Sequence, residues 1–236
     1  MIPLLRVECV SKSFGTRRVL SSASLRAVPG ELRVMFGRNG IGKSTLLRIA
    51  AGLVSPDTGS VHFNERAYLD AHPSRLAEEG LFFLPDHDLL SRAFSARHQL
   101  EMFRRQFGGR DPLDAADEMG VARHLDKRPP ALSGGERRRM EIAAVLVRQP
   151  RCLLADEPYR GISPKDAEDV TATLVRLART GVAVVITGHE VSTLLAAADH
   201  ITWCTSGTTY ELGAPAAATQ NEGFAREYLG PSARGA

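Results

Sequence analysis

The stretch Gly37–Thr45 (GRNGIGKST) carries residue types that bind a chain of phosphates. Its glycines let successive backbone N–H groups point inward as an anion nest, and a helix that begins near Lys43 directs its positive end to the same place. Lys43 adds a full positive charge, and the hydroxyl of Ser44 is placed to ligate Mg²⁺. The apolar run Leu32–Phe36 before it predicts a buried strand. Strand, glycine-rich turn and helix form the P-loop pattern; the alternative is a chance turn with the same spacing.

Two carboxylates follow another apolar run, Cys152–Ala155, which leads into Asp156, Glu157 and Pro158. A buried strand that ends in such acids is the Walker B pattern of nucleotide-binding proteins, and the alternative is a strand that merely ends in acids. A third apolar run, Val184–Thr187, delivers His189 beyond its end. A single histidine at a strand end is usually structural, but its position after the other two motifs favours a functional role.

A small hydroxyl, two glycines and an acid stand where a long helix is expected to begin, in the order Ser133, Gly134, Gly135, Glu136. Ser133 is suited to cap that helix, and the glycines permit close approach of an anion. By itself the pattern favours an ordinary capped helix start. Together with the other motifs it favours a second phosphate-binding element.

Strand and helix patterns alternate around these motifs. Strands are predicted at Leu4–Val10, within Val19–Val28, and at Leu32–Phe36, Ser60–Phe63, Leu81–Leu84, Cys152–Ala155, Val182–Thr187, Ile201–Cys204 and Thr208–Leu212. Helices are predicted at Ser44–Ala51, Pro73–Glu79, Ser95–Phe107, Pro112–Met119, Gly134–Arg148, Pro164–Arg179 and Val191–Ala197. Such alternation predicts an α/β fold with a largely parallel sheet covered by helices. We expect a single domain over residues 1–236, in which 1–88 and 129–236 form the nucleotide-binding core and 89–128 form a helical subdomain, with a frayed tail at 231–236.

Composition sets the broad class of the protein. Of 236 residues, 43% are hydrophobic, enough for a sizeable core, and 24% are charged, which is ordinary for a soluble protein. A net charge of +3 is too small to argue for nucleic acid as a partner. No apolar run approaches the length of a membrane span, and the N-terminus lacks the apolar segment of a signal peptide. Cys9, Cys152 and Cys204 each lie in an apolar run, and we expect them to be reduced core residues.

The P-loop and the stretches LSGGE, LLADEP and ITGHE, in this order, resemble the ATP-binding cassette (ABC) ATPases, the motor subunits of ABC transporters. The resemblance covers residues 4–230. It implies an α/β fold in which a P-loop NTPase core with a mostly parallel sheet is joined by an N-terminal antiparallel β part and a helical subdomain. It also implies that ATP and Mg²⁺ are the cofactors, and that the triphosphate and the metal are cradled by Gly37, Asn39, Gly40, Gly42, Lys43, Ser44 and Thr45.

The resemblance assigns further roles within one chain. Phe14 matches the aromatic residue that stacks on adenine, and the alternative is a strand-end phenylalanine packed in the core. Asp156 would hold Mg²⁺ through water. Glu157 would act as the general base on the attacking water, and His189 would contact the γ-phosphate and link it to Glu157. The expected reaction is hydrolysis of ATP to ADP and phosphate.

The resemblance also implies a dimer that closes around ATP, either of two copies of this chain or with a related ATPase subunit. No arginine finger is evident in cis, yet phosphoryl transfer needs its developing charge stabilised. The γ-phosphate on one P-loop would therefore be capped by the other subunit, through its Ser133, Gly134, Gly135 and Glu136.

Several positions depart from the usual cassette pattern. Asp86 follows Leu84 and Pro85 where cassettes carry a glutamine; it is either a carboxylate ligand of Mg²⁺, a surface aspartate, or the product of a shifted register. Ser163 replaces the usual aspartate, so it either alters coupling across the dimer or simply caps the helix that begins at Pro164. Glu136 replaces the commoner glutamine and should still function. The arginines Arg137–Arg139 are expected on a solvated helix face, with contact to a partner or nucleotide as the alternative.

We therefore expect a transporter subunit that is cytoplasmic and peripheral on the inner face of the cell membrane, held there by an integral membrane partner. The groove between the helical subdomain and the Asp86 loop should receive that partner. The DEPYRGISP loop and the segment 224–230 are similar to those of the branched-chain amino acid and lipopolysaccharide transport group. The alternative is a soluble cassette protein that acts on nucleic acid, ribosomes or cluster assembly. Such proteins usually carry two cassettes, long insertions or basic arms.

Overall fold

The computed structural model describes residues 2–68 and 72–229, so the predicted tail at 231–236 lies outside the described residues. The strands are β1 (Leu5–Phe14), β2 (Arg17–Ala27), β3 (Leu32–Phe36), β4 (Thr58–Phe63), β5 (Arg66–Tyr68), β6 (Leu81–Leu84), β7 (Cys152–Ala155), β8 (Ala183–Thr187), β9 (His200–Thr205) and β10 (Thr208–Gly213). The helices are α1 (Lys43–Ala50), α2 (Pro73–Glu78), α3 (Ala96–Phe107), α4 (Pro112–Glu118), α5 (Gly134–Arg148), α6 (Pro164–Arg179), α7 (Val191–Ala197), α8 (Pro215–Gln220) and α9 (Glu222–Tyr228). Two 3-10 turns, Ala122–His124 and Pro129–Ala131, join α4 to α5.

These strands form one ten-stranded sheet in the order β5-β4-β1-β2-β10-β9-β3-β8-β7-β6. Strands β6, β7, β8 and β3 run parallel to their neighbours, and β9 joins β3 in parallel. Strands β1, β2, β4 and β5 pair antiparallel, and β9 and β10 form the predicted hairpin. The predicted α/β class, a mostly parallel core with an antiparallel N-terminal part, is confirmed.

The central strands are buried on both faces, which explains why their sequences are apolar without alternation. In β3, Leu32, Val34 and Phe36 enter one core cluster and Met35 enters the other. Helix α1 covers the second face through Leu46 and Leu47. Helices α5, α6 and α7 cover the first, and Phe224 of α9 packs there against Phe36 with ring centroids 5.4 Å apart.

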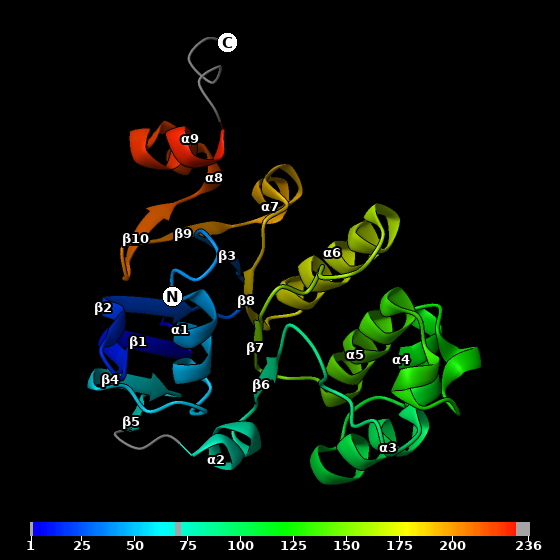
Figure 1. Cartoon of the computed structure of the whole chain (residues 1–236). Coiled ribbons are helices and arrows are strands. Elements are labelled where there is room, and N and C mark those ends of the chain that lie inside the picture. Colours follow the sequence, from blue (N-terminus) through cyan, green and yellow to red (C-terminus); the bar gives the residue numbers. More distant parts are fainter. Residues whose placement is uncertain (1, 69–71, 230–236) are drawn as a thin grey trace.

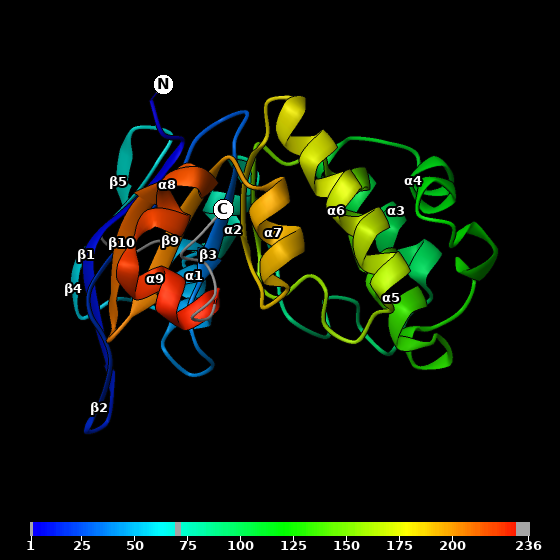
Figure 2. The ribbon, with the colours of Figure 1, turned by 90° about the horizontal axis from the view of Figure 1, so that it is seen from above.

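Helices α3–α6 gather on one side of the molecule and the antiparallel strands on the other (Figures 1 and 2). Helices α3 and α4 pack against α5, which in turn contacts α6. The division of the chain into residues 1–88 with 129–236 and residues 89–128 stays a prediction. Within the described ranges, no helix is long and apolar enough to cross a membrane.

One of the three cysteine predictions is wrong. Cys152 and Cys204 are buried, but Cys9 is exposed. The pairing of β1 with β2 slips between Val7 and Val10, and Cys9 adopts a left-handed backbone with φ 49°. This bulge leaves both Glu8 and Cys9 outside the core, whereas a regular strand would have pointed one of them inward. A bulge of this kind leaves no mark in the apolar pattern of the sequence.

Candidate active site

Three of the motifs and Asp86 meet because the strands that precede them are parallel. The P-loop follows β3, Asp86 follows β6, Asp156 and Glu157 follow β7, and His189 follows β8. Since these four strands are parallel neighbours, their carboxyl ends lie at one edge of the sheet. Ligands of open α/β sheets bind at this edge.

The P-loop turns from β3 into α1 through positions that only glycine fits. Gly42 has φ 116° and precedes the first residue of α1, where no side chain caps the helix. A Cβ atom on Gly37 would lie 2.7 Å from the carbonyl oxygen of Cys204. No side chain therefore competes for the backbone N–H groups at the start of α1, which are among the groups predicted to bind phosphate.

Lys43 lies almost fully inside the protein, with 4% of its surface exposed. Its Nζ donates to the carbonyl oxygens of Gly37, at 2.6 Å, and Arg38, at 3.2 Å. Burial lowers the pKa of Lys43, while the negative charges of Glu157 and Asp156 act in the opposite direction. The ammonium group therefore lies within the electric field of both Walker B carboxylates.

A cavity of about 590 Å³, here called the P-loop cavity, opens over this loop. Phe14 and Arg17, from the turn that joins β1 to β2, line it, and so do Asp86, Glu157 and Arg160, from the loops after β6 and β7. The P-loop contributes Asn39, Gly40, Gly42, Lys43, Ser44 and Thr45 to the same lining. Phe14 is 52% exposed, with the Lys12 ammonium 5.6 Å from its ring centroid, so it is not a core residue. Arg17 and Arg160 were not predicted, because neither belongs to a motif.

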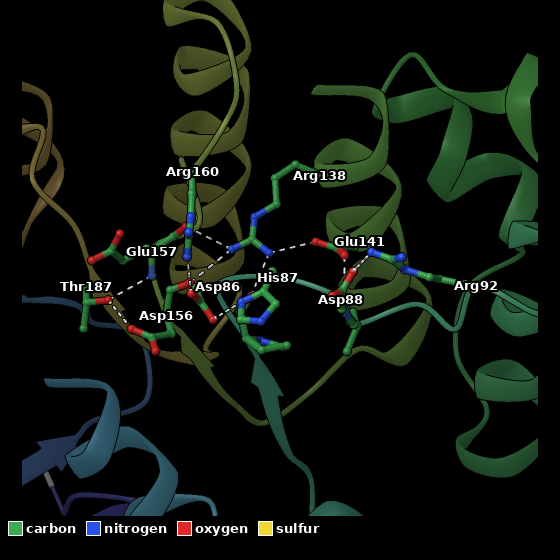
Figure 3. Close-up of polar contacts among 12 residues, drawn as sticks. Asp86, His87, Asp88, Arg92, Arg138, Glu141, Asp156, Glu157, Arg160 and Thr187 are labelled. Atoms are coloured by element: carbon green, nitrogen blue, oxygen red, sulfur yellow. Dashed lines mark hydrogen bonds and ion pairs between the residues drawn. The ribbon is translucent and has the colours of Figure 1, made fainter. Parts of the chain in front are cut away.

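Asp156 and Glu157 are held by a threonine that the sequence reasoning passed over. Thr187 Oγ1 donates to Asp156 Oδ1 over 2.8 Å and accepts from the Glu157 backbone N–H over 2.9 Å (Figure 3). Glu157 has φ 45°, an uncommon conformation for a non-glycine residue. Its Oε1 lies 2.9 Å from Nε2 of His189. The structure thus brings together the predicted base and the predicted histidine. The role of Thr187 could have been inferred from its hydroxyl, which stands at the end of an otherwise apolar, buried strand.

Asp86 lies at the rim of the P-loop cavity, and both of its oxygens have partners. Oδ1 is 2.7 Å from Nδ1 of His87, and Oδ2 accepts from Nη1 of Arg160 at 2.5 Å. Asp86 and Arg160 also line a second cavity of about 360 Å³, here called the rim groove, with Gly134 and Arg137. No cluster of three or more His, Cys, Asp or Glu in the described part of the chain could hold a metal ion by itself.

Residues Ser133–Glu136, here called the helix tip, begin α5 with a capping box. Ser133 Oγ accepts from the Glu136 backbone N–H, and Glu136 Oε2 accepts from the Ser133 backbone N–H over 2.8 Å. Ser133 and Gly134 are exposed. Among the described residues, the lining of the P-loop cavity includes none of the helix tip. Within one chain the P-loop cavity therefore brings together the P-loop and residues after β6 and β7, whereas the helix tip reaches only the adjoining rim groove, through Gly134.

The arginines after the helix tip do not all lie on a solvated helix face, so that prediction is wrong for Arg138. Arg138 is 3% exposed, not on a solvated face. Its guanidinium donates to the carbonyl oxygens of Pro85, Asp156, Glu157 and Pro158 and to Glu141 Oε2, at 2.8–3.2 Å. Arg138 thus ties α5 to the loops after β6 and β7 (Figure 3). Ser163 caps α6 by accepting from the Asp166 backbone N–H, which confirms that interpretation of the position.

The family model that describes ABC transporters matches residues 20–160. A probable ABC transporter ATP-binding protein of Azorhizobium caulinodans is 34% identical over 233 residues, which cover 95% of this chain and 82% of the relative. The lipopolysaccharide export system ATP-binding protein LptB of Escherichia coli is 30% identical over 239 residues, which cover 98% of each chain.

Solved structures agree on the fold. An ATP-binding cassette of an ABC transporter in its ADP conformation is similar with a TM-score of 0.81 and 21% identity, over 98% of this chain and 100% of that one. A dimeric ATP-binding cassette in a post-hydrolysis state, bound to ADP and Pi, is similar with a TM-score of 0.79 and 23% identity, over 88% of this chain and 98% of that one. The predicted family is confirmed: this chain belongs to the ABC transporter family and is one of its ATPase subunits.

Proposed function

We propose that two copies of this chain enclose ATP, hydrolyse it with Glu157 as the general base, and thereby drive a membrane-spanning partner. One observation carries the proposal. At the edge of the P-loop cavity, the Glu157 carboxylate is bonded to His189 and its backbone to Thr187, while the charge of Lys43 is buried at the base of the P-loop. A positioned base and a buried cation on a phosphate-binding loop are what hydrolysis of a phosphoanhydride requires.

The shape of the P-loop cavity supports one orientation of ATP. The exposed ring of Phe14 offers a stacking surface for adenine, and Arg17 comes from the same turn. The backbone N–H groups of the P-loop and Lys43 hold the phosphates. The terminal phosphate then lies toward Glu157, which also lines the cavity.

The residues present fit Mg²⁺. This ion prefers oxygen ligands and is usually held by one or two protein groups together with substrate phosphates. Ser44 supplies a hydroxyl, and Asp156, 1% exposed and oriented by Thr187, supplies a carboxylate. Bound there, Mg²⁺ would neutralise charge on the phosphate oxygens. Asp86 stays a predicted further ligand, because its bonds to His87 and Arg160 use one lone pair on each oxygen and leave others for a metal.

Hydrolysis follows from the position of Glu157. Its carboxylate takes a proton from water as the water oxygen attacks the γ-phosphorus, the bond to the bridging oxygen of ADP breaks, and phosphate leaves. His189, bonded to the same carboxylate, orients it and contacts the γ-phosphate. The helix tip of the second copy supplies backbone N–H groups and the Ser133 hydroxyl to the developing charge.

The partner and its location follow from the rim groove and the relatives. The groove is exposed and shares Asp86 and Arg160 with the P-loop cavity, so a protein segment seated there would contact residues of the active site. LptB is named for lipopolysaccharide export, which supports an integral membrane partner for this chain also. The chain then works at the inner face of the cell membrane.

Glu157→Gln tests the proposal directly. We expect ATP binding to persist, turnover to fall at least about 100-fold, and an ATP-dependent dimer to accumulate in light scattering. Glu65→Gln is the matched control, because Glu65 is also a glutamate with positive φ but lies exposed between β4 and β5. Full ATPase activity of Glu157→Gln would contradict the assignment of the base. Unchanged ATP affinity of Lys43→Ala in calorimetry would contradict the P-loop assignment.

A further inference from the structure

Arg160 is a charged residue of the P-loop cavity that takes no part in the hydrolysis step proposed for Glu157. It lies in the turn after β7, where its backbone N–H donates to the carbonyl oxygen of Glu157 over 3.1 Å. Its side chain stands beside Asp86 and Glu157 (Figure 3). Arg160 lines the P-loop cavity together with Glu157, toward which the proposed function directs the terminal phosphate of ATP.

The guanidinium of Arg160 is available for a ligand. Its side chain is 59% exposed, and within residues 2–68 and 72–229 its one side-chain hydrogen bond goes to Asp86. A guanidinium has five N–H donors, so most of them are free. Arg138 is the contrast, since it lies buried nearby with its donors spent on four carbonyl oxygens and Glu141.

Asp86 explains why Arg160 stands at the rim. Its side chain is only 18% exposed, and it receives His87 on one oxygen and Arg160 on the other. Asp86 and Glu157, both beside Arg160, place two carboxylates in the lining where the most highly charged part of ATP would arrive (Figure 3). The cations of the described lining are Arg17, Lys43 and Arg160; Arg17 comes with Phe14 from the β1–β2 turn, and Lys43 already serves the P-loop. A phosphate offers a guanidinium the same fork of oxygens as a carboxylate, with more charge.

We propose that Arg160 binds the terminal phosphate of ATP, and that Asp86 holds its guanidinium at the cavity rim until ATP arrives. The inference rests on the proposed function, because it takes the P-loop cavity as the ATP site. It gives the Asp86 position a second task, which is to present a cation, and it supplies in cis an arginine that the sequence motifs did not reveal. Because ADP lacks the phosphate concerned, Arg160 should discriminate ATP from ADP.

The test measures ATP and ADP affinities by calorimetry in the Glu157→Gln background, at protein concentrations below those at which light scattering detects the ATP-dependent dimer. Arg160→Gln should weaken ATP binding about tenfold or more and ADP binding less than about threefold. Asp86→Asn should leave ATP binding unchanged or tighter, because it releases the guanidinium. The double variant Asp86→Asn/Arg160→Gln should bind ATP as weakly as Arg160→Gln. Arg92→Gln is the matched control, since Arg92 is exposed, lies 3.8 Å from Asp88 and does not line the P-loop cavity.

Three results would overturn the inference. Recovery of ATP affinity in the double variant would show that Arg160 only neutralises Asp86. Equal loss for ATP and ADP in Arg160→Gln would remove the terminal phosphate as its ligand. Weaker ATP binding by Asp86→Asn in the presence of Mg²⁺ but not in its absence would make Asp86 a metal ligand instead. Lys43→Ala separates this inference from the proposed function: if Lys43→Ala weakens ATP binding and Arg160→Gln does not, only the inference fails.

Discussion

The two sides of the P-loop cavity are built in different ways. On the inner side, Lys43 and Asp156 are buried, at 4% and 1% exposed, and Thr187 holds both acids that follow β7. On the outer side, Asp86 and Arg160 meet in an ion pair at the rim, and the helix tip, of which Gly134 lines the adjoining rim groove, exposes Ser133 and Gly134. The inner side has its partners within the chain, whereas the outer side has donors left for other molecules.

The buried inner side therefore suits the chemical step, and the exposed outer side suits control by other molecules. Buried, hydrogen-bonded groups keep their geometry because any displacement leaves a polar atom without a partner. Exposed ion pairs contribute about 0–1 kcal/mol, so a nucleotide, a second copy or a membrane partner can exchange them at small cost. Arg138 joins the two sides, because it binds carbonyl oxygens both before Asp86 and along the Asp156–Pro158 loop.

Substitution of Arg138, which connects the two sides, should have the largest effect on stability. Arg138→Met leaves the Glu141 carboxylate, also buried, without its cation, and it leaves several carbonyl oxygens without a donor. Loss of one partner of a buried ion pair costs about 3–5 kcal/mol. We expect a loss of that size in urea unfolding, and a loss of about 0.5 kcal/mol or less for the control Arg137→Met, at a partly exposed position. Equal stability of the two variants would mean that Arg138 does not tie the sides together.

Thr187→Val should have the next largest effect, on the inner side alone. The change keeps the shape of the side chain but leaves the Glu157 N–H without an acceptor, which costs about 1–3 kcal/mol. Since the two acids lose their common anchor, we expect ATP turnover to fall at least about tenfold with a smaller change in KM for ATP. Thr187→Ser should restore both stability and turnover, because it returns the hydroxyl. Turnover of Thr187→Val equal to wild type would show that strand β7 positions the acids without help.

The same division explains what the sequence could predict. The P-loop, the two acids after β7 and the alternation of strand and helix are local patterns, so motif spacing was enough to predict the sheet and the inner side. Asp86 and Arg160 are 74 residues apart, and their ion pair depends on β6 and β7 lying side by side. Arg138 gave a local sign that was not used: at helical spacing it shares a face with Ile142 and Val145, which are buried. The run of three arginines after the helix start favoured a solvated helix face instead.

Two serine caps allow the helix tip to be compared with an ordinary helix start. Ser133→Ala removes the cap of α5 and Ser163→Ala that of α6, so each should lose about 1 kcal/mol of stability. If the helix tip serves the γ-phosphate of a second copy, Ser133→Ala should also lower turnover about tenfold, while Ser163→Ala should stay within about twofold. Equal ATPase rates in the two variants would reduce the helix tip to a structural cap.

The smallest expected effect is a pH dependence of the helix tip. The Ser133 backbone N–H, and then its side chain, hold the pKa of Glu136 below its ordinary value of 4.5, with lesser help from His124 and Lys127. Because the unfolded chain takes up this proton first as the pH falls, the contribution is complete above 4.5 and is lost as the pH falls through the lowered pKa of the folded chain.

Glu136→Gln cannot lose this contribution, since its amide does not titrate. The difference in unfolding free energy between wild type and Glu136→Gln should therefore be constant near neutral pH and shrink below about pH 4.5, measured by urea unfolding at each pH. A difference that stays constant to the lowest pH at which the chain folds would mean that the capping box holds without the carboxylate charge. The helix tip would then need no charge of its own, and its task toward a second copy would rest on the Ser133 hydroxyl and the backbone N–H groups alone.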